Sequence, residues 1–331
     1  MEPIAIYSGK LIIYYSGLII FFAVAACFAV SYSLYTSYAG NGRALWVLLP
    51  IAVVFSLFFC RAVHWYCHAE QYTGFFNAIF DYSGGGYVLP GALLGTWLAA
   101  LCVKRLGFTD NVPRLLDAVA PGGALGVALI RLSALFNSSC RAKIAVETPF
   151  LRRLPFASPV YSSGAEDYRF ATFFVQFLIM LIVFLFLYSF CCKERSHPMK
   201  RGVPAEGHVA RLFLLLHSAV ELIMDSTRYD SSYMHFNGFV SIVQMAAAFC
   251  ILGVLLRYSV WSVRANGLGI RHFIRWLLWL ASLVGVGLSE YFVQRHGDWY
   301  LKCYSIMAVS IVLMCVSVIR MYQSCREEKY E

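Results

Sequence analysis

The chain alternates between long apolar runs and short polar connections. Runs of about 20 apolar residues recur, which is the length needed to cross a hydrocarbon core of about 30 Å. Lipid offers no partner to backbone groups, so each span must be a helix or part of a closed barrel. The runs are continuous rather than alternating, and this predicts an all-α polytopic membrane bundle with about nine spans. The predicted spans are residues 11–37, 45–66, 87–104, 113–136, 169–191, 208–228, 236–256, 273–290 and 304–320.

Lysine and arginine in the loops predict the orientation. The connections 67–86 and 229–235 contain neither residue. The intervening loops are basic, with Lys104 and Arg105 in one of them. Because such loops stay in the cytoplasm, we expect the N-terminus outside and the C-terminus in the cytoplasm. The longest loop, 138–168, is an exception, since it is basic but falls on the outer side.

Composition agrees with a membrane protein and excludes several other classes. Sixty per cent of the 331 residues are hydrophobic and 14% are charged, more apolar surface than a soluble domain can bury. The net charge of +9 follows from the basic loops, and no basic stripe interleaved with aromatics indicates nucleic-acid binding. The 11 cysteines form no CxxC pair and no Cys/His metal spacing, so no metal or cofactor is expected.

An arginine lies inside the fourth predicted span. Arg131 stands in ALGVALIRLSALFNSS, and Asn137 follows near the outer end of the span. An ionisable group at membrane depth is costly and normally faces a partner or a cavity. A guanidinium matches phosphate oxygens in a bidentate way, so a phospholipid phosphate is one partner for Arg131. The alternative is an internal salt bridge that holds two helices together.

The sixth predicted span has a polar face. His217, Glu221, Asp225 and Arg228 fall within an arc of about 80° on a helix. This face is typical of a proton-handling or headgroup-binding cluster, and the alternative is a self-neutralising network that packs the bundle. Two carboxylates against one arginine invite a further cation, and Arg131 is the obvious one.

Two further features concern the second to fourth spans. Arg61 and His64 lie one turn apart near the outer end of the second span, among aromatic residues typical of an interfacial belt. Glycines in 83–95 and Pro121 with its neighbouring glycines predict breaks in the third and fourth spans. Such breaks are tolerated only where protein or a water-filled cavity satisfies the backbone. Close packing of helices against small residues is an equally good interpretation.

Several segments, in this order, resemble the prolipoprotein diacylglyceryl transferase family over about residues 8–256. The strongest is LLDAVAPGGALGVALIRLSALFNSSC, in which Asp117 opens the motif and Arg131 and Asn137 follow. Others are IIYYSGLII (12–20), FFCRAVHWY (58–66), GGGYVLPGALLG (84–95) and the sixth span with RYD (228–230). The chain departs from the family at Pro90, where the resemblance expects an essential histidine.

The resemblance implies an enzyme of the bacterial cytoplasmic (inner) membrane. Such enzymes move a diacylglyceryl group from phosphatidylglycerol to a lipobox cysteine thiol of a preprolipoprotein. On this basis Arg131, Asn137, Arg228 and Arg61 would bind the lipid phosphate. The base for the thiol would be Glu221, Asp225 or His217, with His64 as a further candidate. The expected partners are phosphatidylglycerol and the preprolipoprotein signal peptide. The expected organisation is a transferase-like domain of about seven helices (1–256), followed by two additional helices and a short tail (257–331).

Two other functions compete with transfer. Pro90 favours a paralogue that binds a lipid or lipopeptide without catalysis. A small-solute transporter is the third hypothesis, to which the predicted breaks would point. No repeated pair of broken helices occurs in the two halves, which counts against transport.

Overall fold

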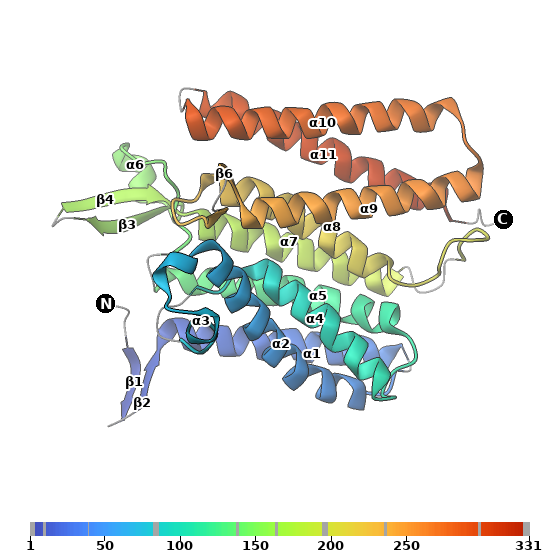
Figure 1. Cartoon of the computed structure of the whole chain (residues 1–331), viewed down its shortest axis with the longest axis horizontal. Helices are drawn as coiled ribbons and strands as arrows, with labels where there is room; N and C mark the ends of the chain where they lie inside the picture. Colours follow the sequence, from blue (N-terminus) through green and yellow to red (C-terminus); the bar gives the residue numbers. More distant parts are fainter. Residues whose placement is uncertain are drawn as a thin grey trace.

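A computed structural model describes residues 4–8, 11–38, 40–81, 86–136, 139–162, 165–193, 198–234, 237–296 and 299–326. Long helices run side by side along the longest axis (Figure 1). Those of 17 residues or more within the described ranges are α1 (Tyr15–Ser37), α2 (Arg43–Cys67), α4 (Leu89–Arg105), α5 (Val112–Leu132), α7 (Thr172–Lys193), α8 (His208–Thr227), α9 (Ile242–Asn266), α10 (Ile270–Arg295) and α11 (Tyr300–Ser324).

Each predicted span overlaps one of these helices, and the chain is a multi-pass membrane protein. Among the described residues, seven helices are long and apolar enough to cross a membrane. The other two long helices are α4, which has only 17 residues, and α8, which carries the buried charged groups. The number of nine spans and the orientation of the termini therefore stay predictions.

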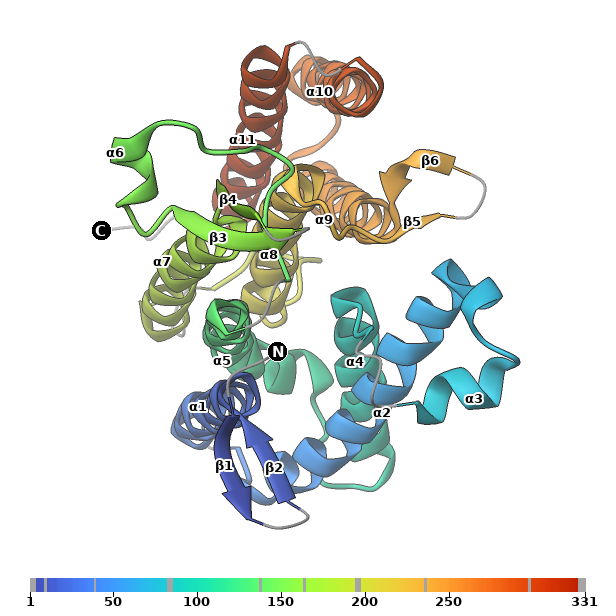
Figure 2. The ribbon, with the colours of Figure 1, turned by 90° about the vertical axis from the view of Figure 1, so that its left-hand side faces the viewer.

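Within the described ranges the bundle is mostly helical rather than all-α, because three two-stranded antiparallel hairpins lie at one end of it (Figures 1 and 2). They are β1 (Ile4–Ser8) with β2 (Leu11–Tyr14), β3 (Ala157–Ser162) with β4 (Ala165–Phe170), and β5 (Tyr233–Met234) with β6 (Asn237–Ser241). The predicted spans that begin at 11, 169 and 236 therefore start too early, since α1, α7 and α9 each begin directly after or just beyond a strand. The residues of β2, LIIY, are apolar enough to extend a hydrophobic run, and strand pairing satisfies backbone groups outside the helices. Short helices also lie outside the long ones: α3 (Phe75–Phe80), α6 (Pro149–Arg152) and the 3-10 turns Ala69–Gln71 and Ser133–Leu135.

The glycines of the third and fourth spans serve close packing. A Cβ on Gly91 would lie 2.4 Å from the backbone nitrogen of Cys60, so α4 and α2 approach at backbone distance. A Cβ on Gly122 would lie 2.5 Å from the carbonyl oxygen of Cys27, which brings α5 equally close to α1. Helix α5 continues through Pro121 to Leu132, so the predicted break in the fourth span is wrong.

Helix α8 occupies the centre of the bundle. It contacts α5, α7, α9 and α11, and twelve of its residues are buried. Neighbouring helices therefore keep its polar face away from lipid, which is what charged groups at this depth require.

Candidate functional site

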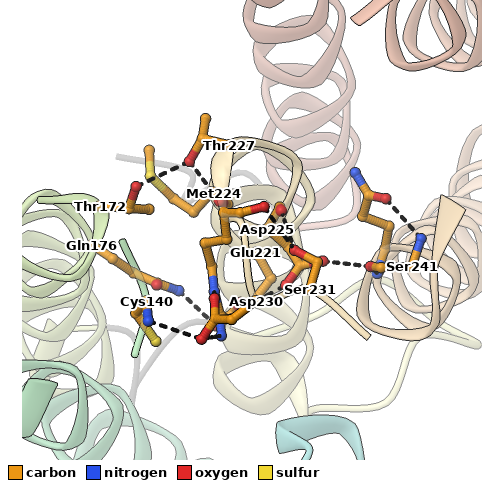
Figure 3. A network of polar contacts seen from close by, with 12 residues as sticks. Cys140, Thr172, Gln176, Glu221, Met224, Asp225, Thr227, Asp230, Ser231 and Ser241 are labelled. Atoms are coloured by element: carbon orange, nitrogen blue, oxygen red, sulfur yellow. Dashed lines mark hydrogen bonds and ion pairs between the residues drawn. The ribbon is translucent and has the colours of Figure 1, made fainter. Parts of the chain in front are cut away.

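The centre of the site is Glu221 on α8. Its side chain is 2% exposed, and its Oε1 accepts a hydrogen bond from Arg131 Nη2 of α5 at 2.8 Å. Gln176 of α7 donates from Nε2 to the same oxygen at 2.6 Å (Figure 3). His217 lies one turn earlier on α8, with Nδ1 4.0 Å from Glu221 Oε1. The predicted pairing of Arg131 with a carboxylate of α8 is confirmed for Glu221, whereas Asp225 pairs with Arg228.

Several buried polar atoms around the Glu221 carboxylate have unsatisfied hydrogen-bonding capacity within the described residues. Arg131 Nε, Gln176 Oε1, His217 Nδ1 and Glu221 Oε2 are buried and have no hydrogen-bond partner in the part of the chain that the structure describes. A buried polar atom without a partner costs about 1–3 kcal/mol, so native proteins rarely keep several in one place. Their concentration on one carboxylate, one amide, one imidazole and one guanidinium leaves hydrogen-bonding capacity that a polar ligand could use.

A second charged group lies one turn further along, where α8 ends. Arg228 forms a fork on Asp230, with Nε 3.0 Å from Oδ1 and Nη2 3.2 Å from Oδ2. Its Nη1 lies 3.5 Å from Asp225 Oδ1, and Asp225 Oδ2 accepts a hydrogen bond from the Ser241 hydroxyl (Figure 3). Both oxygens of Asp225 are therefore engaged, which makes it a poorer base candidate than His217.

Residues 139–142 connect the group around Glu221 to the group around Arg228. The Cys140 backbone N–H donates to Asp230 Oδ2 at 2.9 Å, while Arg131 Nη1 donates to the Cys140 sulfur at 3.2 Å. Burial by itself would raise the pKa of Asp230, but the hydrogen bonds and charge of Arg228, together with the Cys140 N–H, hold this pKa below its usual range. Cys140 thus connects Arg131 to Asp230, the carboxylate that holds Arg228.

His217 lines one cavity, and a second cavity lies next to it. The first, of about 240 Å³, lies between α4, α8 and α9 and is lined by Pro90, Trp97, His217 and Glu221 among others. The second, of about 340 Å³, is apolar and lies among α1, α2, α4, α5 and α8. Leu93, Trp97 and Leu214 line both, and His217 stacks on Phe213, which lines the second, with ring centroids 5.5 Å apart. Both cavities are mainly apolar, and the first also carries the polar side chains of His217, Ser218 and Glu221, which suits an amphipathic ligand.

Comparison with known proteins decides the family. A sequence model of the prolipoprotein diacylglyceryl transferase family matches residues 3–262. The chain belongs to this family. It is also 27% identical, over 236 residues, to a phosphatidylglycerol–prolipoprotein diacylglyceryl transferase of Parasynechococcus marenigrum (strain WH8102), which covers 69% of this chain and 80% of the relative. The resemblance seen in the sequence is thereby confirmed, and the matched range ends within α9, before α10 and α11.

The other residues predicted from the family pattern have different positions. Asn137 lies outside the described residues. Arg61 is buried on α2 and donates from Nε and Nη2 to the Ala78 carbonyl at 2.9 and 2.5 Å, so it holds α3 against α2. Asp117 accepts from the backbone N–H groups of Gly207 and Ala210 at 2.5 and 2.8 Å, and it therefore caps the start of α8. The structure does not unite these two with Arg131 in the site.

Three site residues were missed by the sequence analysis. Gln176 was the detectable one, because it is a lone amide within the apolar run TFFVQFLIM. Asp230 was noticed only as part of RYD, and its contact with Arg228 is local. Cys140 could not be found from sequence, since it acts through its backbone N–H as well as its sulfur.

Proposed function

We propose that the chain is a transferase that moves a diacylglyceryl group from phosphatidylglycerol to the cysteine thiol of a lipobox in a preprolipoprotein. The sulfur would form a thioether bond to the terminal glyceryl carbon of the lipid, while the bond from that carbon to the phosphate oxygen breaks. The thiol proton goes to a base, and glycerol phosphate leaves. The proposed location is the bacterial cytoplasmic membrane, where both partners, the lipid and the signal peptide, are within reach of the bundle.

The leaving phosphate gains negative charge as the carbon–oxygen bond breaks. A fixed cation beside it lowers the barrier most when water is excluded. Arg131 meets this need because it is 12% exposed and its Nε is unpartnered within the described ranges. Arg228 supplies a second positive charge, linked to Arg131 through Asp230 and Cys140. Glu221 fixes the orientation of the Arg131 guanidinium and is itself held by Gln176.

The observation that carries this proposal is the shared pocket of Pro90 and His217. Family members are expected to carry a histidine at position 90, on α4, and this chain has lost it. His217 lines the same pocket from α8, and its Nδ1 has no hydrogen-bond partner in the described part of the chain. We therefore assign the base to His217, so that an imidazole is restored to this pocket from a different helix. Glu221 then acts by holding Arg131 rather than by accepting the thiol proton.

The test is release of glycerol phosphate by the purified protein in phosphatidylglycerol membranes when a lipobox peptide is added. We expect release with the cysteine peptide and none with a serine version of the same peptide. Release should fall to background for both Arg131→Ala and His217→Asn. Wild-type protein that releases no more glycerol phosphate than Arg131→Ala would rule out the transferase reaction.

A second candidate is a family member that binds phosphatidylglycerol or a lipopeptide without transfer. The replacement of the family's histidine by Pro90 favours it. Under this alternative Arg131→Ala weakens lipid binding, whereas His217→Asn changes neither binding nor turnover, because no turnover occurs.

A further inference from the structure

The hairpin of α10 and α11 lies beyond the residues that the family model matches. It packs beside α8 and α9, away from α1 and α2, in both views (Figures 1 and 2). Helix α8 carries His217, Glu221 and Asp225, so the hairpin is placed to act on the site without touching the pocket.

At the Thr227 end of α8, the hairpin contributes a buried carboxylate. Glu290 of α10 is 4% exposed, and its Oε2 accepts a hydrogen bond from the Ser226 hydroxyl at 2.5 Å. Gln294 donates to Glu290 Oε1 at 2.8 Å. Tyr304 of α11 lies 3.4 Å from the same Ser226 hydroxyl. A buried carboxylate is costly unless its oxygens are bonded, and here α8 and Gln294 provide the donors.

Gln294 also links α10 to the segment beside Arg228. Its Oε1 accepts from Lys143 Nζ at 2.6 Å, and Lys143 Nζ also donates to the Tyr233 hydroxyl at 2.7 Å. The Lys143 backbone N–H donates to the Thr227 carbonyl at 2.8 Å. The neighbouring residue, Ala142, forms an antiparallel bridge with Arg228. Contacts from α10 thus reach the backbone that presents Arg228.

At the His208 end of α8, the hairpin makes a second attachment. The His208 ring lies 5.1 Å from that of Tyr322 in α11, and its Nδ1 lies 2.9 Å from the Tyr258 hydroxyl. The Lys200 backbone N–H, in the segment that leads into α8, donates to the Cys325 carbonyl at 2.9 Å. The hairpin therefore holds α8 near both of its ends.

We propose that the α10–α11 hairpin is a positioning element for the site, in which Glu290 and Gln294 set the rotation of α8 through Ser226 and Lys143. This inference rests on the proposed function. A rotation of α8 by about 10° moves an atom about 6 Å from the axis by about 1 Å. Misplacement by about 1 Å can reduce a rate by about 100-fold. A rotation of this size, set at Ser226, would therefore displace the His217 ring enough to slow the reaction.

The test compares Glu290→Gln and Gln294→Leu with Leu288→Ala in the full-length protein in nanodiscs. Leu288 is on the same helix and faces outward, 55% exposed, so it serves as the matched control. We expect the first two variants to lower kcat about 10- to 100-fold while KM for phosphatidylglycerol changes less than about threefold. The control should keep wild-type values. Loss of a merely stabilising contact would lower the amount of folded enzyme but leave kcat per folded molecule unchanged, and that result overturns the proposal.

A second readout does not require turnover. The ¹⁵N chemical shifts of the His217 imidazole, assigned with His217→Asn, report its tautomer, protonation and hydrogen bonding, which depend on how the ring lies relative to Glu221 and Arg131. We expect them to change in Glu290→Gln and Gln294→Leu and to stay fixed in Leu288→Ala. If wild-type protein shows no turnover but these shifts move, the transferase proposal fails while the positioning role stands. If the shifts match those of the control in both variants, the positioning role is refuted, whatever the activity.

Discussion

The ion pair between Arg131 and Glu221 gives the sharpest test of what the arginine is for. The sequence left two interpretations open, a phosphate ligand and a structural salt bridge, and the structure shows the bridge at 2.8 Å. Removal of one partner from a buried pair typically costs 3–5 kcal/mol, because the other charge stays buried without compensation. Arg131→Met is therefore expected to lower the free energy of unfolding by about 3 kcal/mol.

The double variant Arg131→Met/Glu221→Leu separates the two interpretations. Replacing a buried ion pair by apolar residues of similar size is often neutral or stabilising. We expect the double variant to recover most of the stability lost by Arg131→Met, measured by unfolding in mixed micelles. Hydrogen bonds from a charged group contribute about 1.5–3 kcal/mol, so the double variant should bind phosphatidylglycerol about 10- to 150-fold more weakly than wild type.

The assay is equilibrium binding of a short-chain phosphatidylglycerol, with phosphatidylcholine of equal chain length as the control lipid. A double variant that is stable and binds phosphatidylglycerol as tightly as wild type would refute the reasoning. It would mean that Arg131 only joins α5 to α8 and has no role toward a lipid phosphate.

Three further predictions concern single positions. His217→Asn should reduce the rate of transfer by about 100- to 10,000-fold. Phosphatidylglycerol binding should change less than about threefold, which is about the limit of a binding assay. Equal losses of transfer and binding would contradict the assignment of His217 as the base. Asp230 has a pKa below its usual range in the folded protein, so its contribution to stability is present above the ordinary aspartate pKa and is lost as pH falls through the depressed value. The difference in unfolding free energy between wild type and Asp230→Asn should be constant from about pH 7 to 5 and shrink below about pH 4; a difference that stays constant to pH 3 would refute this. Gly91→Ala should destabilise the protein by about 1–3 kcal/mol, because the new Cβ would meet the α2 backbone at Cys60. The control Gly253→Ala, in open space on α9, should be neutral or stabilising. Equal melting temperatures for the two variants would contradict the close packing of α4 on α2.

The polar face of α8 could be predicted from sequence because charged groups at membrane depth obey strong rules. Spacing alone placed His217, Glu221 and Asp225 on one face, and charge balance alone pointed to Arg131 as their partner. The structure confirms that pairing because the cost of a buried, uncompensated charge leaves few alternatives. The same rules do not tell which carboxylate the arginine selects, and that choice depends on how α5 packs against α8.

Other parts of the site depend on tertiary contacts that the local pattern does not encode. Gln176 reaches Glu221 only because α7 packs against α8. The strands before α1 and α9 were hidden in the predicted spans, since a strand residue and a helix residue contribute equally to hydrophobicity. The strand before α7, AEDYRF, lay mostly in the predicted loop 138–168. Arg61 is a residue type that can bind phosphate, but its guanidinium donates a hydrogen bond to the Ala78 carbonyl instead.

The most direct test of the transferase proposal is lipidation in cells that lack their own prolipoprotein diacylglyceryl transferase. When this chain is expressed there, mass spectrometry of a reporter lipoprotein should show a diacylglyceryl group on its lipobox cysteine. The group should be absent when the chain carries His217→Asn, although the variant is present in the membrane at the wild-type level. An unmodified reporter in cells with wild-type protein in the membrane would contradict the proposed reaction.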